Sequence, residues 1–193
     1  MKKLKFLLGI LFLLSLNSCS SDDDSSEAIS IVGKMAVNGV EYDLTKGFII
    51  PNPDGSDPNF NPRRFYFILA NGNVTYANDE FVYSDEITQL IDFNMYTSIQ
   101  SSGNVENTTY PILNTNDPNF SLNNAYIDHS GINTNVVIQN QVYISSNSLS
   151  SDDMTQGQAT INLVNGVYTI TFSFSNNNNV ITGNFTGTMT NLN

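Results

Sequence analysis

The chain has 193 residues, with 18 acidic residues, 7 basic residues and a formal net charge of −11 at pH 7. Binding to nucleic acid requires a basic face that neutralises phosphates, so this charge argues against a nucleic-acid partner. With one cysteine and one histidine, the chain forms no intramolecular disulfide and has too few ligands of these types for a zinc site.

Residues 1–18 have the pattern of a cleavable signal peptide. Three lysines within Met1 to Lys5 precede an apolar run from Phe6 to Leu16, which ends in a polar stretch. A transmembrane helix needs roughly 20 apolar residues, and this run is shorter, so we expect a targeting segment. Its removal leaves 4 basic residues against 18 acidic ones, a formal charge of −14. This charge repels anionic lipid head groups, so membrane attachment would rest on acyl chains.

The four residues Leu16-Asn17-Ser18-Cys19 resemble a lipobox. The resemblance implies cleavage before Cys19, a lipid on its thiol and acylation of the new amine. Each buried methylene of an acyl chain contributes about 0.8 kcal/mol, so two or three chains hold a protein durably at a membrane. The alternative is an ordinary cysteine in a soluble secreted protein.

Residues 19–28 have the composition of a flexible tether, because a polar, like-charged stretch buries nothing. The stretch that follows Cys19 is also similar to the acidic export signal of Bacteroidota lipoproteins. That resemblance implies display on the outer face of the outer membrane. The residues expected to form the export signal are Ser20, Ser21, Asp22, Asp23 and Asp24.

Residues 29–193 have the length of one domain, and the pattern along them is that of β-strands. Apolar and polar residues alternate with period two, and the apolar ones are mainly strand formers. We predict an all-β domain of about nine to eleven strands in sequential hairpins. The alternation does not decide between an antiparallel sandwich and an up-and-down, lipocalin-like barrel.

Three Asn-Gly pairs predict tight hairpin turns, since both residues tolerate positive φ angles. The turns are Asn38-Gly39, Asn71-Gly72 and Asn165-Gly166, between the strand pairs 31–37 and 40–44, 64–69 and 74–76, and 159–163 and 167–174. The aromatic run within 64–69 predicts a strand buried on both faces or an interior strand. The last hairpin places Tyr168, Ile170, Phe172 and Phe174 on one face.

Four further segments have patterns that predict three strands and one possible helix. A strand over 180–189 carries Gly183 and Gly187 on its apolar side, which indicates close approach of bulky neighbours. Residues 91–99 and 136–144 alternate as strands do. A short helix over 85–91 is a further possibility.

Two long polar loops, 51–62 and 114–124, each contain Asp-Pro-Asn-Phe. The repeat is consistent with a duplicated unit that sets both loops side by side as a binding rim, or with ordinary turn chemistry used twice. The residues expected to contact a ligand are Asp57, Asn59, Phe60, Asp117, Asn119 and Phe120. Oxygen ligands in these loops would suit calcium, although neither loop has the spacing of a known calcium loop.

No pattern in the sequence predicts catalysis. His129 lies in Ile127 to Gly131, which has the composition of a strand end and a turn, and no nucleophile motif accompanies it. The adjacent acids Asp79-Glu80, Asp85-Glu86 and Asp152-Asp153 are typical of solvated loops. We therefore predict a protein that is not an enzyme and has no cofactor besides the lipid on Cys19.

Three segments together resemble uncharacterised β-rich lipoprotein domains of Bacteroidota: Gly33 to Tyr42, Phe93 to Ile99 with Tyr110-Pro111, and Val167 to Thr188. The resemblance covers most of the chain after Cys19 and implies location and fold, with no catalytic residues. The expected function is that of a lipid-anchored binding or accessory module for a glycan or protein ligand. The alternatives are a structural envelope lipoprotein and a carboxylate-based glycan hydrolase.

Overall fold

The computed structural model describes residues 31–51, 64–78, 80–101, 103–113, 116–149 and 154–192. These residues form fourteen strands and no helix. The strands are β1 (Val32–Val37), β2 (Val40–Asp43), β3 (Lys46–Pro51), β4 (Arg64–Ala70), β5 (Val74–Ala77), β6 (Glu80–Tyr83), β7 (Gln89–Tyr96), β8 (Thr109–Pro111), β9 (Tyr126–Gln139), β10 (Val142–Leu149), β11 (Gln156–Val164), β12 (Val167–Ser175), β13 (Val180–Gly187) and β14 (Met189–Asn191).

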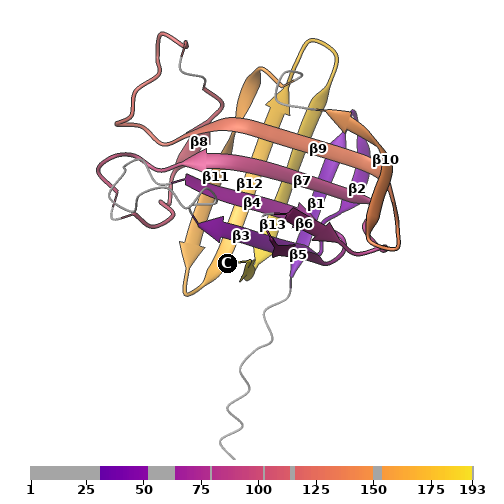
Figure 1. Cartoon of the computed structure of the whole chain (residues 1–193). Coiled ribbons are helices and arrows are strands. Elements are labelled where there is room, and N and C mark those ends of the chain that lie inside the picture. The colour runs from indigo at the N-terminus through magenta and orange to yellow at the C-terminus, as the bar shows by residue number, and fades with distance from the viewer. Residues whose placement is uncertain are drawn as a thin grey trace, which may run out of the picture.

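Twelve of the strands form two six-stranded sheets that pack as a sandwich, and β5 and β6 form a separate two-stranded sheet. Sheet A has the order β2-β1-β13-β12-β11-β8, and sheet B has the order β10-β9-β7-β4-β3-β14. The strands of sheet B run across those of sheet A (Figure 1). Pairing is antiparallel except between β14 and β3, which run parallel. No helix among the described residues has the length and apolar character to cross a bilayer.

The predicted all-β class and sandwich are confirmed, and the barrel alternative is wrong. Each sheet keeps two edge strands, β2 and β8 in sheet A and β10 and β14 in sheet B, so the sheets do not close. The fourteen strands exceed the predicted number because turns divide several expected segments. Asn140 and Gln141, both with positive φ, split 136–144 between β9 and β10. The strand expected over 180–189 ends at Gly187, and Met189 begins β14 in the other sheet.

Two of the three predicted hairpins are confirmed. Asn38 and Gly39 have φ of 51° and 84° between β1 and β2, and Asn165 and Gly166 have φ of 52° and 80° between β11 and β12. Left-handed φ at both positions is the geometry of a type I′ turn.

The hairpin predicted at Asn71-Gly72 is wrong. Strand β4 is an interior strand between β3 and β7, whereas β5 pairs with β6. Asn71 is held by Thr88, whose backbone N–H donates to Asn71 Oδ1 at 3.0 Å. Two hydrogen bonds join Asn71 to Thr88, the residue before β7. They direct the chain away from sheet B. The short helix predicted over 85–91 is also wrong, because Asp85 and Glu86 form a turn and Gln89 begins β7.

The main core lies between the two sheets. Phe93 of sheet B contacts Phe172 and Phe174 of sheet A, with ring centroids 5.5 Å apart in each pair. A Cβ atom at Gly183 would lie 2.2 Å from Phe172 Cζ, so this glycine makes room for the ring, as the sequence predicts.

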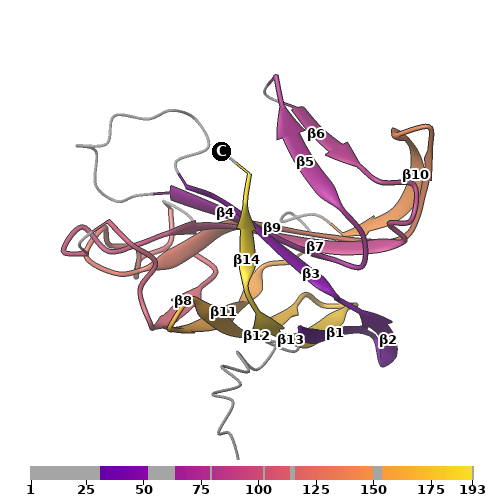
Figure 2. The ribbon, with the colours of Figure 1, turned by 90° about the horizontal axis from the view of Figure 1, so that it is seen from below.

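A second apolar cluster covers the outer face of sheet B, the face turned away from sheet A. The hairpin of β5 and β6 stands over this face (Figure 2). Along β9, Ile132 belongs to the main core, whereas Val136 and Ile138 belong to this second cluster. Asn135, which has a φ of 51°, lies between them. Sheet B is therefore buried on both faces at its centre, where seven of the eight residues of β7 are buried.

Candidate functional site

A cleft of about 690 Å³ opens between the segment that follows β7 and the loop that precedes β9. Its walls carry mainly hydroxyl and amide side chains. The lining residues are Ser98, Glu106, Asn107, Thr108, Thr109, Pro111, Leu113, Asn119, Asn123, Asn124 and Ala125. Glu106 is the single carboxylate in this lining, so the cleft presents donors and acceptors of hydrogen bonds with little charge.

Hydrogen bonds fix the wall that contains Glu106. Ser98 donates to the Glu106 carboxylate from its backbone N–H at 3.0 Å and from its hydroxyl at 2.7 Å. The backbone N–H of Glu106 donates to the hydroxyl of Tyr110, a buried core residue, at 2.9 Å. Asn107 bonds both the N–H and the C=O of Leu163 in β11. The wall is therefore tied to sheet A and to the core, which preorganises the cleft.

The opposite wall is the loop with the second Asp-Pro-Asn-Phe segment. The Asp117 carboxylate accepts a hydrogen bond from the Asn119 N–H at 2.8 Å, and the Asp117 carbonyl accepts one from the Phe120 N–H at 2.9 Å. This geometry is that of an Asx turn. Asn119 consequently lies exposed on the cleft, whereas Asp117 shapes the turn.

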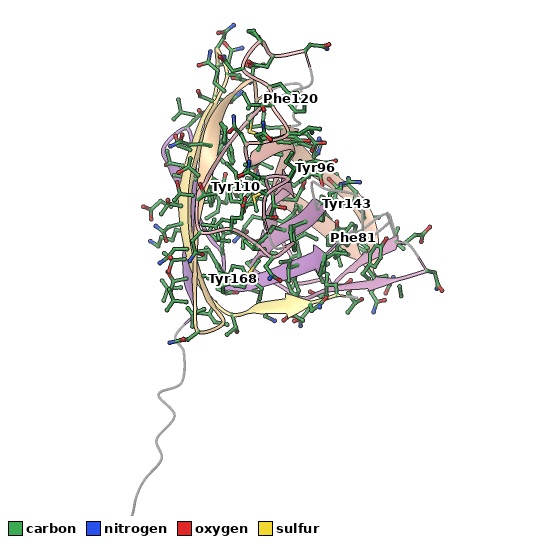
Figure 3. All side chains as sticks on the ribbon, turned by 90° about the vertical axis from the view of Figure 1, so that its left-hand side faces the viewer. Phe81, Tyr96, Tyr110, Phe120, Tyr143 and Tyr168 are labelled. Atoms are coloured by element: carbon green, nitrogen blue, oxygen red, sulfur yellow. The ribbon has the colours of Figure 1, made fainter. Side chains whose placement is uncertain are left out.

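Phe120 anchors the same loop on the sandwich. Its ring meets Tyr126 edge-on at a centroid distance of 5.1 Å, and Tyr126 stacks on Tyr96 at 4.8 Å. In Figure 3, Phe120 and Tyr96 lie along the side of sheet B, and Tyr110 lies between the sheets. Of the residues that the sequence predicts for this loop, Asn119 lines the cleft, and Asp117 and Phe120 hold it in place.

The other predicted site residues lie outside the described part of the chain. They are Cys19, Ser20, Ser21, Asp22, Asp23, Asp24, Asp57, Asn59 and Phe60. The strands beside the two Asp-Pro-Asn-Phe loops are not equivalent, since β3 and β4 are neighbours in sheet B, whereas β8 belongs to sheet A and β9 to sheet B. The described strands thus give no sign of a duplicated unit.

His129 lies within β9, not in the strand end and turn that the sequence predicts. Its Nε2 is 3.9 Å from Oδ1 of Asp92. Ser130 pairs with the core residue Phe93 and is buried, so its hydroxyl is on the opposite face from His129. A Ser-His-Asp arrangement is therefore not formed at this position.

Of the acidic residues that are adjacent in sequence, those that the structure describes lie in turns or on the surface. Asp85 accepts hydrogen bonds from the N–H groups of Asn140 and Gln141, at 3.2 and 2.8 Å. Glu86 is exposed and lies 3.9 Å from Lys46. Asp79 and the pair at 152–153 lie outside the described residues. Within the described ranges, no three histidine, cysteine or acidic side chains gather as metal ligands would.

Sequence reasoning missed Ser98 and Glu106 in the cleft and Asp92 on sheet B. Nothing in the local sequence marks these residues, because their positions depend on pairing between strands far apart in the chain. No protein-family model matches this chain, and no curated protein or solved structure is significantly similar to it.

Proposed function

We propose that the protein is a non-enzymatic binding module that acyl chains on Cys19 hold at the outer membrane, facing outward. The ligand that best suits the cleft is a glycan. The observation that carries this proposal is the cleft itself, about 690 Å³ in volume and lined by amides and hydroxyls on a rigid frame. Sugar hydroxyls both donate and accept hydrogen bonds, as these side chains do.

The cleft favours binding over hydrolysis. Glycosidases use two carboxyl groups on opposite sides of the scissile bond, whereas the described lining holds Glu106 alone. Both oxygens of Glu106 accept hydrogen bonds from Ser98. A carboxylate engaged in this way positions the wall of the cleft and is poorly placed to transfer a proton.

The test is binding of the purified protein to a glycan array, followed by calorimetry with the sugars retained. Asn119→Ala combined with Asn123→Ala removes two amides from the cleft and should weaken binding roughly tenfold or more, since each lost hydrogen bond is worth about 0.5–1.5 kcal/mol. Asn162→Ala, on the exposed face of β11, is the matched control and should bind as the wild type does. Equal affinities for all three proteins, or binding to peptides in place of sugars, would contradict a glycan cleft.

One observation favours the structural alternative, a lipoprotein that pairs with another envelope protein. Strand β10 is an edge strand of sheet B and exposes Val142, Tyr143 and Ile144. Exposed apolar edges are sites where other chains pair. Crosslinking in intact cells would reveal a stoichiometric protein partner under this alternative and none under the glycan proposal.

A further inference from the structure

Asp92 is a buried carboxylate on the outer face of sheet B, in a place separate from the cleft. It lies in β7 opposite Gly131 of β9, and 7% of its surface is exposed. A Cβ atom at Gly131 would lie 2.7 Å from Asp92 Oδ2, so the carboxylate rests directly on the backbone of β9. The Gly131 N–H and the Tyr66 hydroxyl donate hydrogen bonds to it.

One oxygen of this carboxylate has no hydrogen-bond partner. Among the described residues, Asp92 Oδ1 is fully buried and receives no donor. His129 Nε2 is 3.9 Å away, beyond hydrogen-bond distance, and the His129 side chain is 45% exposed. A buried anionic oxygen without a partner is costly, so this position favours a donor that carries positive charge.

Aromatic side chains from two strands lie near Asp92. Tyr66 comes from β4, and Tyr83 from β6 in the hairpin above the sheet, with the Phe81 ring 5.4 Å from Tyr66 and 6.1 Å from Tyr83. The pKa of Tyr83 is raised to about 12. Burial is the largest cause, and the charges of Asp92 and Tyr143 add to it. These rings are neutral at physiological pH, and their faces attract cations.

Two carboxylates, Asp92 and Asp128, and two basic side chains, Arg64 and His129, lie in this region. Arg64 of β4 is the nearby permanent cation, and its Nε donates to Asn94 Oδ1 at 2.5 Å. Asn94 in turn donates to Asp128 of β9 at 2.6 Å. Arg64 is thus engaged with the Asn94–Asp128 pair, and His129 is the other basic group that faces Asp92. The formal charge of −14 expected after signal-peptide removal adds to the attraction of cations.

We propose that Asp92 is the anionic end of a second ligand site, on the outer face of sheet B, which takes a primary ammonium group such as the end of a lysine side chain. The ammonium group donates to Asp92 Oδ1 while the exposed His129 side chain turns outward. A neutral hydroxyl offers a hydrogen bond but leaves the buried charge uncompensated.

The imidazole of His129 is the probe for this site, because the chain contains one histidine and its C–H proton signals are therefore unique in an NMR spectrum. The purified full-length protein is titrated with n-butylammonium chloride and, separately, with n-butanol, at about pH 7.5, where carboxylates are ionised. The amine should shift the His129 signals to a plateau, and the alcohol should not.

Asp92→Asn, which keeps the shape of the side chain, should weaken amine binding roughly ten- to a hundredfold, the value of a hydrogen bond to a charged group. Asp43→Asn removes an exposed carboxylate from sheet A and should leave the affinity unchanged. His129→Gln, followed by calorimetry, should still bind the amine. Circular dichroism establishes that each variant is folded. Equal shifts with butanol, or equal affinity in Asp92→Asn, would overturn the proposal.

Discussion

Replacement of Asp92 by Asn should stabilise the domain at neutral pH. Burial is the largest influence on Asp92 and raises its pKa from 3.8 to about 6, although the nearby His129 and the hydrogen bonds from Tyr66 and Gly131 oppose the rise. The folded state therefore binds a proton that the unfolded state releases between about pH 4 and pH 6. The contribution of this group to stability falls as the pH rises through that window and stays low above it.

The size of the effect follows from the two pKa values. Since one unit of pKa corresponds to about 1.4 kcal/mol, ionised Asp92 costs about 3 kcal/mol at pH 7 relative to an unburied carboxyl. Asparagine avoids the charge but brings amide N–H groups that need acceptors, which costs about 1–2 kcal/mol. The net gain in the free energy of unfolding should therefore be about 1–2 kcal/mol at pH 7.

Urea unfolding of wild type and Asp92→Asn, at pH 4.5 and pH 7.5, measures this difference. The comparison at each pH cancels the titration of the other carboxyl groups. The advantage of the variant should be present at pH 7.5 and small or absent at about pH 4.5, where the folded wild type holds the proton. If the variant is the less stable protein at pH 7.5, or if its advantage is the same at both pH values, the buried charge is not the source of the cost.

Two substitutions test the packing of the sandwich. Phe185→Ala removes a fully buried ring of the main core and should lower the free energy of unfolding by about 3–5 kcal/mol. The control Asn184→Ala, at an exposed neighbouring position, should change the free energy of unfolding little. Equal effects of the two substitutions would refute the core assignment. Gly183→Ala places a methyl group 2.2 Å from Phe172 Cζ and 2.5 Å from the Lys34 carbonyl oxygen, so it should destabilise by about 1–3 kcal/mol. Thermal unfolding of Gly183→Ala, with Thr182→Ala at an exposed position as the control, measures the destabilisation. An unchanged midpoint in Gly183→Ala would contradict the expected clash with the Phe172 ring and the Lys34 carbonyl.

The local features of the fold were accessible from the sequence, and the long-range ones were not. Asn38-Gly39 and Asn165-Gly166 predict hairpins because the turn geometry depends on those residues alone. Asn71-Gly72 has the same sequence, yet Thr88 binds Asn71 and the chain leaves the sheet. Its pairing is decided 17 residues downstream, beyond the reach of a local pattern.

The same division applies to the site. Asn119 was predictable because Asp-Pro-Asn marks an exposed turn. Ser98 and Glu106 face the cleft only because Tyr110 ties their segment to the core. Asp92 is buried because the hairpin of β5 and β6 folds over sheet B, and in the sequence it is one polar residue in an alternating strand.

We propose that a ligand-binding sandwich is held at the outer membrane by lipid on Cys19. The most direct measurement is intact-protein mass spectrometry of the native protein from the membrane fraction. We predict a mature chain that begins at Cys19 and carries two or three acyl chains, with the lipid on the N-terminal residue. An unacylated N-terminus on the membrane-fraction protein would contradict this proposal.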